Sequence, residues 1–249
     1  MGDHRRFFID PGQIEGDVAV IREETAHQIA RVLRLREGED IRLLDGRGRE
    51  YEARIASVSA SEVVVDVIRL CECEREPRLK LTLAVCMPKA DKLDLIVQKV
   101  CELGISRLVI ANSERVVSRP DAVKAASRIE RWRKIAEEAA EQCGRCRTPE
   151  IVGIIEFAEL AGYIRSHGLS MVAWEDETRT SLKSVLADHA NAESAMLIVG
   201  PEGGLSRREV ESARSAGASC VSLGSRILRC ETAAIAACAA IMYELEGEL

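Results

Sequence analysis

The sequence predicts an α/β protein, in which helices cover both faces of a parallel sheet and a smaller β-rich region comes first. From residue 17 to residue 70, apolar and polar residues alternate in short runs that glycines separate. After residue 79, short apolar runs alternate with stretches of helical spacing, the order typical of a parallel sheet. With 249 residues, 47% of them hydrophobic, the chain is long enough to build both cores.

The front region is predicted to be a small barrel or sandwich. Its alternating runs predict four strands, at 17–22, 39–45, 49–57 and 62–70. Between the first two, residues 27–35 have the apolar spacing of a helix. Gly46 and Gly48 supply the turn between the second and third strands. Short strands joined by glycine turns are typical of small barrels and sandwiches.

The rear region is predicted to hold the parallel sheet. Its strands are expected at 80–86, 107–111, 151–155, 170–174, 195–200 and 220–223. Its helices are expected at 92–103, 121–143, 157–167, 207–216 and 232–246. Ligands of such sheets bind beyond the carboxyl ends of the strands. Candidate sites are therefore the loops that follow Val85, Ile110, Trp174, Val199 and Leu223.

Composition excludes several classes of protein. No apolar run approaches the roughly 18 residues of a membrane span, and the N-terminus lacks the apolar segment of a signal peptide. We therefore expect a cytoplasmic protein with no membrane contact. The net charge of −6 argues against a wholly basic nucleic-acid binder, but a local basic patch is compatible with it.

Cysteine spacing argues against a metal site. Cys143 and Cys146 form a CxxC pair, and Cys71 and Cys73 form a CxC pair among nine cysteines. The four histidines complete no zinc-binding pattern with them. We expect reduced thiols, several of them small core residues such as Cys238, and no metal.

Arginine is concentrated at the front of the chain. Ten arginines and no lysine lie between residues 5 and 54. A guanidinium binds phosphate in a bidentate manner and stacks on bases, which favours contact with RNA. The pair Arg5 and Arg6 precedes Phe7 and Phe8, two of the few aromatic residues. The alternatives are solvated strand faces and a phenylalanine pair that anchors a strand.

The loop after the predicted strand 195–200 has the sequence Gly200-Pro-Glu-Gly-Gly204. Three glycines around a proline let the backbone approach a ligand closely in a fixed bend. Glu202 is the carboxylate of this loop and suits a cationic or hydrogen-donating ligand. The alternative is a tight turn with a solvated glutamate. Ser206 is the expected N-cap of the next helix.

The loop after the predicted strand 220–223 is also unusual. Ile227 and Leu228 suit a flat aromatic ligand such as adenine, and Arg226 and Arg229 suit an anionic partner. Folding of the isoleucine and leucine into the core is the alternative. The patterns GxxxxGK(S/T), GxGxxG and GxSxG are absent from these loops, which excludes a P-loop, a Rossmann dinucleotide fingerprint and a nucleophile elbow.

Two further segments carry charge near the expected helix ends. In Met87-Pro-Lys-Ala-Asp-Lys92, the ammonium groups of Lys89 and Lys92 suit phosphate, with surface solvation as the alternative. The segment Glu141-Gln-Cys-Gly-Arg145 closes the predicted helix 121–143, with Gly144 at the position where helices end.

Five motifs, in chain order, resemble those of the RsmE family of bacterial ribosomal RNA methyltransferases. They are RRFF, PKADKLDLIVQKVCELG, EQCGR, VGPEGGLSRREVE and LGSRILRCETAA. The resemblance covers nearly the whole chain. Members of this family methylate N3 of one uridine in small-subunit ribosomal RNA and belong to the SPOUT superfamily. Leu205 and Cys230 depart from the usual phenylalanine and threonine.

The resemblance implies a PUA-like β-barrel RNA-binding domain over residues 1–74. It implies a SPOUT α/β domain with a C-terminal trefoil knot over residues 75–249. It also implies a homodimer, and 16S ribosomal RNA or the small ribosomal subunit as the partner. The implied cofactor is S-adenosylmethionine, bound by Trp174, Val199, Gly200, Pro201, Glu202, Gly203, Gly204, Leu223, Gly224, Ile227, Leu228 and Arg229.

Methylation of uracil N3 requires loss of the N3 proton, so a cation near the base favours the reaction. Arg229 is the expected group for charge stabilisation or base orientation. Glu202 is a second candidate catalytic residue, to orient or deprotonate the base. Contact with RNA is assigned to Arg5, Arg6, Arg31, Arg34, Lys89, Lys92 and Arg145.

Three alternatives remain open. A related SPOUT enzyme of the same fold would methylate a ribose 2′-oxygen or a transfer RNA base. A non-catalytic RNA-binding factor of ribosome assembly would retain the pocket without the activity. A metal-site protein would use the CxxC pair.

Overall fold

The computed structural model of the protein describes residues 5–59, 61–73, 75–89, 92–116 and 121–247. Met1–His4, Glu74 at the predicted domain boundary, and Ala90 and Asp91 of the PKADK motif lie outside these ranges. The chain divides into two compact units. The first consists of Met1–Glu76 and Ala140–Thr148, and the second of Pro77–Ala139 and Pro149–Leu249.

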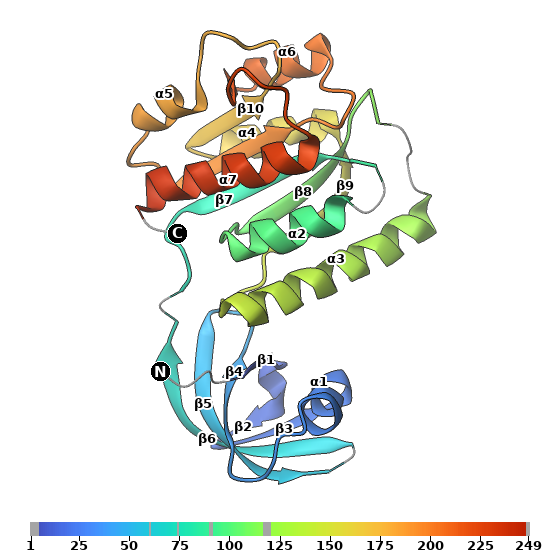
Figure 1. Ribbon diagram of the computed structural model, residues 1–249, viewed down its shortest axis with the longest axis vertical. Coiled ribbons are helices and arrows are strands. Elements are labelled where there is room, and N and C mark those ends of the chain that lie inside the picture. The colour runs from blue at the N-terminus through green and yellow to red at the C-terminus, as the bar shows by residue number, and fades with distance from the viewer. Residues whose placement is uncertain (1–4, 60, 74, 90–91, 117–120, 248–249) are drawn as a thin grey trace. The chain divides into compact units, whose positions relative to one another are not determined.

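The first unit is built on one curled six-stranded sheet with the order β1-β4-β5-β6-β3-β2 (Figure 1). Its strands are β1 (Arg6–Phe8), β2 (Ile14–Glu15), β3 (Val18–Arg22), β4 (Asp40–Leu44), β5 (Arg49–Val58) and β6 (Glu62–Glu72). The β1–β4 pairing is parallel and the other pairings are antiparallel. Phe7, Ile21 and Ile41 are fully buried in its core, so the phenylalanine pair anchors the first strand.

The four predicted front strands are present, with ends that shift by up to two residues. The helix begins earlier than predicted. It runs through α1 (Glu23–His27) and continues as a π-helix over Gln28–Val32. The two glutamates of its first turn favour this earlier start, because their charges lie at the positive end of the helix dipole. Arg34, with a left-handed φ of 54°, lies just beyond its end.

The second unit contains a six-stranded sheet with the order β12-β10-β11-β7-β8-β9, and every pairing in it is parallel. Its strands are β7 (Lys80–Cys86), β8 (Arg107–Asn112), β9 (Glu150–Glu156), β10 (Leu169–Ala173), β11 (Ser194–Val199) and β12 (Ser219–Val221). The predicted parallel sheet and its six strands are therefore confirmed.

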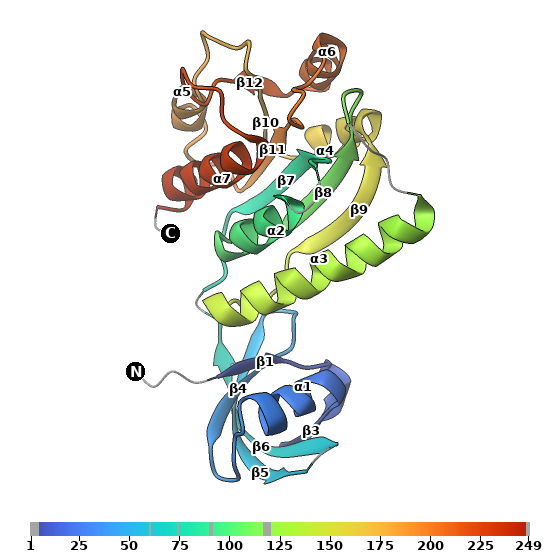
Figure 2. The ribbon, with the colours of Figure 1, turned by 45° about the vertical axis from the view of Figure 1, so that its right-hand side comes forward.

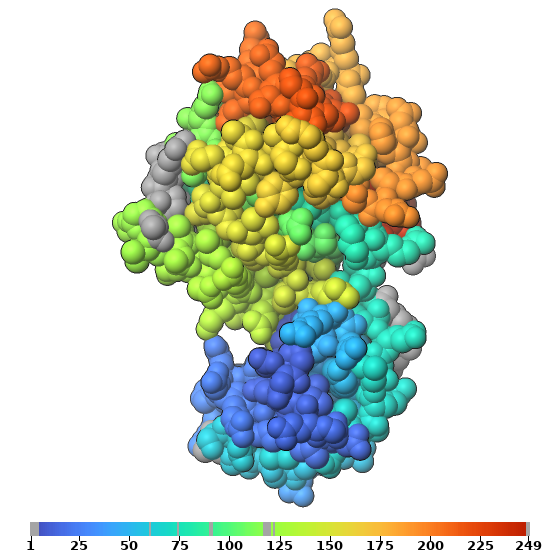
Figure 3. Space-filling view, turned by 180° about the vertical axis from the view of Figure 1, so that it is seen from behind, coloured from blue at the N-terminus to red at the C-terminus, as the bar shows by residue number. Residues whose placement is uncertain are grey.

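Helices cover both faces of this sheet. They are α2 (Lys92–Glu102), α3 (Ala122–Cys143), α4 (Leu160–Ser166), α5 (Leu182–Ala187), α6 (Arg207–Ser215) and α7 (Cys230–Glu246). The apolar cluster on one face takes residues from α2, α5 and α7, and the cluster on the other takes residues from α4 and α6. Figure 2 shows α2 and α7 on their face, and Figure 3 shows the opposite face, where α4 (yellow) and α6 (orange-red) lie.

The short helix α5 was not predicted, because its six residues are too few for a periodic signal. Ser181 caps its N-terminus by accepting a hydrogen bond from the backbone of Ser184. Among the described residues, no helix is long and apolar enough to cross a membrane.

A disulfide joins Cys73 to Cys146 within the first unit. The expectation that the cysteines are reduced is therefore wrong for these two, and Cys146 bonds Cys73 rather than its CxxC neighbour Cys143. Spacing along the chain did not reveal this pair, because 73 residues separate its members. The bridge fastens the excursion Ala140–Thr148 to the end of the front sheet.

Opening this disulfide is expected to lower the free energy of unfolding by as much as about 4 kcal/mol, because the bridge restricts a long loop of the unfolded chain. Thermal unfolding with and without a phosphine reductant measures the effect. The unfolded, unreduced protein should titrate as seven free thiols and the reduced one as nine. Cys146→Ser should be insensitive to the reductant, and Cys143→Ser should retain the sensitivity. Nine thiols before reduction would contradict the bridge.

Candidate functional site

The order of strands in the second sheet gathers three loops at one edge. Ala173 at the end of β10 is in register with Val199 of β11 on one side and with Val221 of β12 on the other. Val199 is in turn in register with Val85 of β7. Since these strands are parallel, the segments that follow them leave the sheet side by side. This is the arrangement in which α/β proteins bind ligands.

A pocket of about 460 Å³ opens between these loops, within the size range of small-molecule sites. It is lined by all twelve residues that the sequence analysis assigned to the cofactor: Trp174, Val199, Gly200, Pro201, Glu202, Gly203, Gly204, Leu223, Gly224, Ile227, Leu228 and Arg229. Segments 19 or more residues apart in sequence thus meet around one cavity.

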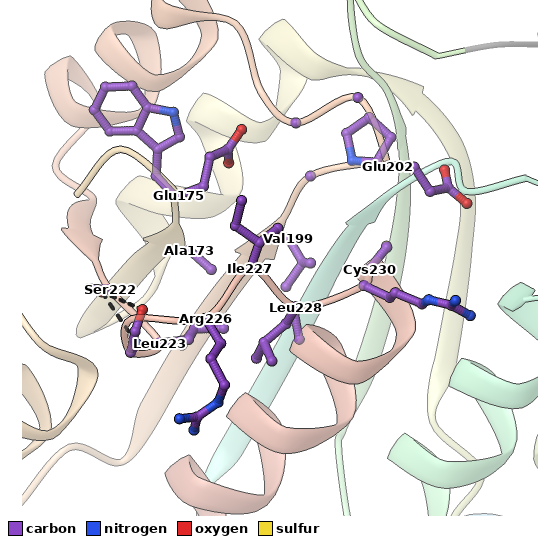
Figure 4. A pocket seen from close by; sticks show the side chains of 18 of the residues that line it. Ala173, Glu175, Val199, Glu202, Ser222, Leu223, Arg226, Ile227, Leu228 and Cys230 are labelled. Atoms are coloured by element: carbon purple, nitrogen blue, oxygen red, sulfur yellow. Dashed lines mark hydrogen bonds between the residues drawn. The ribbon is translucent and has the colours of Figure 1, made fainter. Parts of the chain in front are cut away.

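The structure adds seven lining residues to this set. They are Ala173, Glu175, Ser222, Ser225, Arg226, Cys230 and Ala233. Most lie beside predicted residues in the same loops, so the loop sequences themselves were the available signal. Glu175 differs from the other six in its charge, because it brings a second carboxylate to the pocket in addition to that of Glu202. Figure 4 shows the Glu175 side chain among those that line the pocket. A Cβ on Gly204 would collide with this carboxylate.

The conformation of the Gly200–Gly204 loop depends on its glycines. Gly204 has a φ of +70°, which side-chain-bearing residues rarely adopt, and its N–H donates to the Pro201 carbonyl. A Cβ on Gly200 would lie 2.9 Å from Cγ of buried Leu205. The loop ends at Ser206, the predicted N-cap, which forms a capping box with Glu209.

Two residues that the sequence analysis missed support this loop from outside. A guanidinium nitrogen of Arg115 donates to the Gly203 carbonyl at 2.9 Å. Buried Glu209 accepts hydrogen bonds of 2.8 Å from the backbone N–H groups of Ser206 and Glu114. No short motif marks these contacts, because Arg115 and Glu114 follow β8, on the far side of β7 from β11.

The loop after β12 leaves an apolar side chain exposed at the pocket. Ile227 is 90% exposed, so it does not fold into the core, whereas Leu228 is partly buried against the main apolar cluster. The side chains of Arg226 and Arg229 are exposed. Arg229 is also the N-cap residue of α7. The loop therefore offers apolar and cationic groups together, as its sequence predicted.

The predicted RNA-contact residues have different surroundings. Arg5, Arg31, Arg34 and Lys89 are exposed. The side chain of Arg6 is 19% exposed, and its Nε lies 3.7 Å from a Glu50 carboxylate oxygen.

Arg145 is 4% exposed, and its guanidinium lies 3.0 Å from a Glu76 carboxylate oxygen within the first unit. It is part of the internal structure in this conformation, which differs from the surface position that the prediction requires. Sequence alone does not reveal this, because the helix-ending glycine before Arg145 is equally compatible with an exposed side chain.

Lys92, which is predicted to contact RNA, is half-buried beside two carboxylates. Its Nζ lies 3.1 Å from Oε1 of Glu202 and 3.1 Å from Oε2 of Glu231. Figure 4 shows the Glu202 carboxylate pointing away from Glu175 and Ile227.

A further cluster with metal-like spacing lies in the first unit. Within the described ranges, Glu50, Cys73 and Cys146 bring one carboxylate and two sulfurs together. The two sulfurs are bonded to each other, and Arg6 and Arg42 lie 3.7 and 3.8 Å from the Glu50 carboxylate. Neither feature favours a cation there.

Comparison of the chain with known protein families gives the class to which its two units and its pocket belong. Residues 74–242 match an RNA methyltransferase domain, and residues 21–68 match an RNA methyltransferase PUA domain. The protein is therefore an RNA methyltransferase whose first unit is a PUA domain, and RNA is its partner.

Individual relatives narrow this class. The chain is 34% identical to the ribosomal RNA small subunit methyltransferase E of Bacillus subtilis, with 97% of each chain covered. A crystal structure of that enzyme from Neisseria gonorrhoeae, bound to S-adenosylmethionine, is 30% identical, with a TM-score of 0.86 over 96% of this chain and 97% of the other. A Legionella pneumophila putative methyltransferase with bound SAM is 29% identical, with a TM-score of 0.87 over 97% and 98%.

The chain belongs to the ribosomal RNA small subunit methyltransferase E family. The resemblance predicted from five motifs is confirmed, as is the combination of an α/β domain with a PUA-like domain.

Proposed function

We propose that the protein transfers the methyl group of S-adenosylmethionine to N3 of a specific uridine in 16S ribosomal RNA. The observation that carries this proposal is the pocket at the ends of β10, β11 and β12, where all twelve residues assigned to the cofactor meet. The cofactor bound in the related Neisseria and Legionella structures supports it.

The residues of the pocket fit this cofactor. Glycine at positions 200 and 204 has no side chain, so the backbone of the loop is open to a ligand. Other residues would not fit, because a Cβ at position 200 would collide with Leu205 and one at position 204 with Glu175. Backbone groups of such a loop suit the polar edges of a nucleoside. Ile227, Leu228 and Val199 supply apolar surface for an adenine ring.

When bound, the cofactor supplies an electrophilic methyl group on a sulfonium. In the transfer, the S–CH₃ bond breaks as the N3–CH₃ bond forms, S-adenosylhomocysteine leaves, and the N3 proton passes to water. Arg229 lines the pocket and is exposed, and its guanidinium stabilises the negative charge of the deprotonated uracil. The loops around the pocket orient the cofactor and restrict access of water.

The PUA domain and exposed arginines 5, 31 and 34 contact the RNA backbone, and the target uridine leaves its stack to reach the pocket. The protein acts as a homodimer in the cytoplasm, without a resident metal. Its second domain has the trefoil knot of the SPOUT superfamily. These finer statements rest on the family resemblance.

Purified protein incubated with labelled S-adenosylmethionine and small ribosomal subunits tests the proposal. Digestion to nucleosides and mass spectrometry should give 3-methyluridine in 16S ribosomal RNA, and free 16S ribosomal RNA serves as the second substrate. RNA from a strain that lacks the gene should lack this nucleoside and regain it on complementation. Formation of 2′-O-methylated nucleosides, or of a methylated transfer RNA base, would contradict the proposed target and would identify the nucleotide that is methylated. Cofactor binding without any methyl transfer would favour a non-catalytic factor.

A further inference from the structure

Lys92 connects three segments that lie far apart in the sequence. It is the first residue of α2, Glu202 lies in the loop after β11, and Glu231 lies in the first turn of α7. The lysine Nζ is 3.1 Å from one carboxylate oxygen of each glutamate. We call Lys92, Glu202 and Glu231 the Lys92 triad.

The backbone reinforces the contact to Glu202. The N–H of Lys89 donates to both oxygens of this carboxylate, at 3.1 and 3.3 Å. The segment after β7 therefore binds the tip of the glycine loop with its main chain as well as with a side chain. Such charge-assisted hydrogen bonds are stronger than those between neutral groups.

The Lys92 triad joins the two loops of the pocket, one of whose lining residues is Glu202 itself. Glu202 lies between Pro201 and Gly203, both of which line the pocket. Glu231 directly follows Arg229 and Cys230, which line its other side. Lys92 itself is not among the lining residues, so an effect of Lys92 on the ligand would be transmitted through the loops.

The electrostatics of the Lys92 triad depend on the ammonium group. Both carboxylate oxygens lie 3.1 Å from the same nitrogen, which places them close enough to repel each other strongly without it. Burial alone would raise the pKa of Glu202, but hydrogen bonds from backbone N–H groups and Lys92 outweigh it and lower this pKa. For Glu231 too, burial would raise the pKa, but a backbone N–H and Lys92 outweigh burial and lower it. Both groups are therefore ionised at pH 6–8.

The other charged groups around the Lys92 triad do not replace the lysine. Close contact of its ammonium group with the carboxylates of Glu202 and Glu231 raises the pKa of Lys92, so it stays protonated. Burial, followed by the nearby glutamates, raises the pKa of the Cys230 thiol to about 12, so this thiol is neutral. The guanidinium of Arg229 adds a weaker attraction for Glu231. Lys89 contacts Glu202 through its backbone rather than its ammonium group.

We propose that Lys92 is a positioning residue of the methyltransferase: by pairing with Glu202 and Glu231, it keeps the two pocket loops at the separation that S-adenosylmethionine requires. This inference rests on the proposed function, because it assumes that the cofactor binds in this pocket. It also gives Glu202 a role in loop geometry, since a carboxylate with three donors and a lowered pKa is a weak base.

Calorimetric titration of Lys92→Met with S-adenosylmethionine, at pH 8 and at pH 6, tests the proposal. At pH 8 the dissociation constant should rise at least tenfold relative to the unaltered protein. At pH 6 this ratio should fall at least threefold, because without the ammonium group repulsion raises the pKa values of the two carboxylates and favours protonation of one of them. Because the dissociation constants of the variant and the unaltered protein are compared at the same pH, any change in the protonation of the cofactor itself cancels in their ratio. The turnover number at saturating cofactor should change less than the dissociation constant.

Two further variants separate electrostatics from general damage. The double variant Lys92→Met/Glu231→Gln removes one negative charge and should recover affinity at pH 8 and lose the pH dependence. Lys99→Met is the matched control on the same helix, since Lys99 also pairs with a carboxylate, that of Glu102, at 2.8 Å. It should bind the cofactor like the unaltered protein.

Lys92→Gln serves if the methionine variant does not fold, and the same pH-dependent loss is expected from its neutral amide. Cofactor affinity of the Lys92 variant equal to that of the unaltered protein at both pH values would overturn the inference. An equal loss at both pH values, without rescue by Glu231→Gln, would also overturn it. Absence of binding by the unaltered protein would overturn the proposed cofactor site and the inference with it.

Discussion

Replacing Arg229 by alanine is expected to lower the turnover number of methyl transfer by roughly 10²- to 10³-fold, the range seen when one group that stabilises transition-state charge is removed. The physical reason is that uracil N3 attacks only after losing its proton, and a guanidinium from a residue that lines the pocket favours the resulting anion. The affinity for S-adenosylmethionine should change by less than about threefold, because a charge aimed at the base contributes little to cofactor binding. Single-turnover methylation of small subunits and calorimetric titration of the cofactor measure the two quantities.

Arg229→Lys is the matched variant for this prediction. It keeps the positive charge but loses the planar fork of donors, so its turnover number should lie between those of the unaltered protein and the alanine variant. Normal turnover in Arg229→Ala would remove this residue from the catalytic assignment. A large loss of cofactor affinity with unchanged turnover at saturation would leave cofactor binding as its only role.

Replacing Gly200 by alanine is expected to weaken S-adenosylmethionine binding by roughly 5- to 150-fold. The added Cβ would lie 2.9 Å from Cγ and 3.2 Å from the backbone nitrogen of Leu205. Leu205 is buried among α4, α6 and the sheet, so it cannot move away freely. Overpacking of this kind costs about 1–3 kcal/mol, and a loop that shifts to relieve it leaves the geometry of the pocket.

Gly162→Ala is the control for this substitution. Gly162 lies within α4, and a Cβ there would meet no atom within 4 Å. This variant should bind the cofactor normally and gain slight stability, because alanine favours a helix over glycine. The double variant Gly200→Ala/Leu205→Ala, which removes the colliding Cγ, should recover part of the affinity. Undiminished binding by Gly200→Ala would show that the loop does not need a bare backbone at this position.

Much of the fold was predictable from local patterns. The strand Lys80–Cys86 is predicted with its observed bounds, because a largely apolar run between polar segments is a strong signal of a buried strand. The glycine loop and its N-cap Ser206 were equally clear, since glycine, proline and serine act on the backbone within a few residues. The two-residue strand Ile14–Glu15 and helix α5 were missed, because they are shorter than the periods that would reveal them.

The candidate site was predictable as a set of loops but not as a set of contacts. The rule that ligands bind beyond strand ends pointed to the loops, and the family resemblance implied the twelve residues. The partners of Lys92 and of Arg115 were not predictable, because each depends on which strands are neighbours. Arg145 and Lys92 show the consequence, since each was assigned to RNA on its charge and each is paired with a carboxylate.

The sequence by itself determined most of the strands and helices, the glycine-rich bend and the family, because these depend on side chains close together in the chain. Only the tertiary structure decided that Ala173, Val199 and Val221 end in one row, that Cys73 bonds Cys146, and that one lysine joins two pocket loops. The physical reason is that such contacts form between segments tens of residues apart. Their pairing is selected by the packing of the whole sheet and its two apolar clusters, which no local pattern specifies.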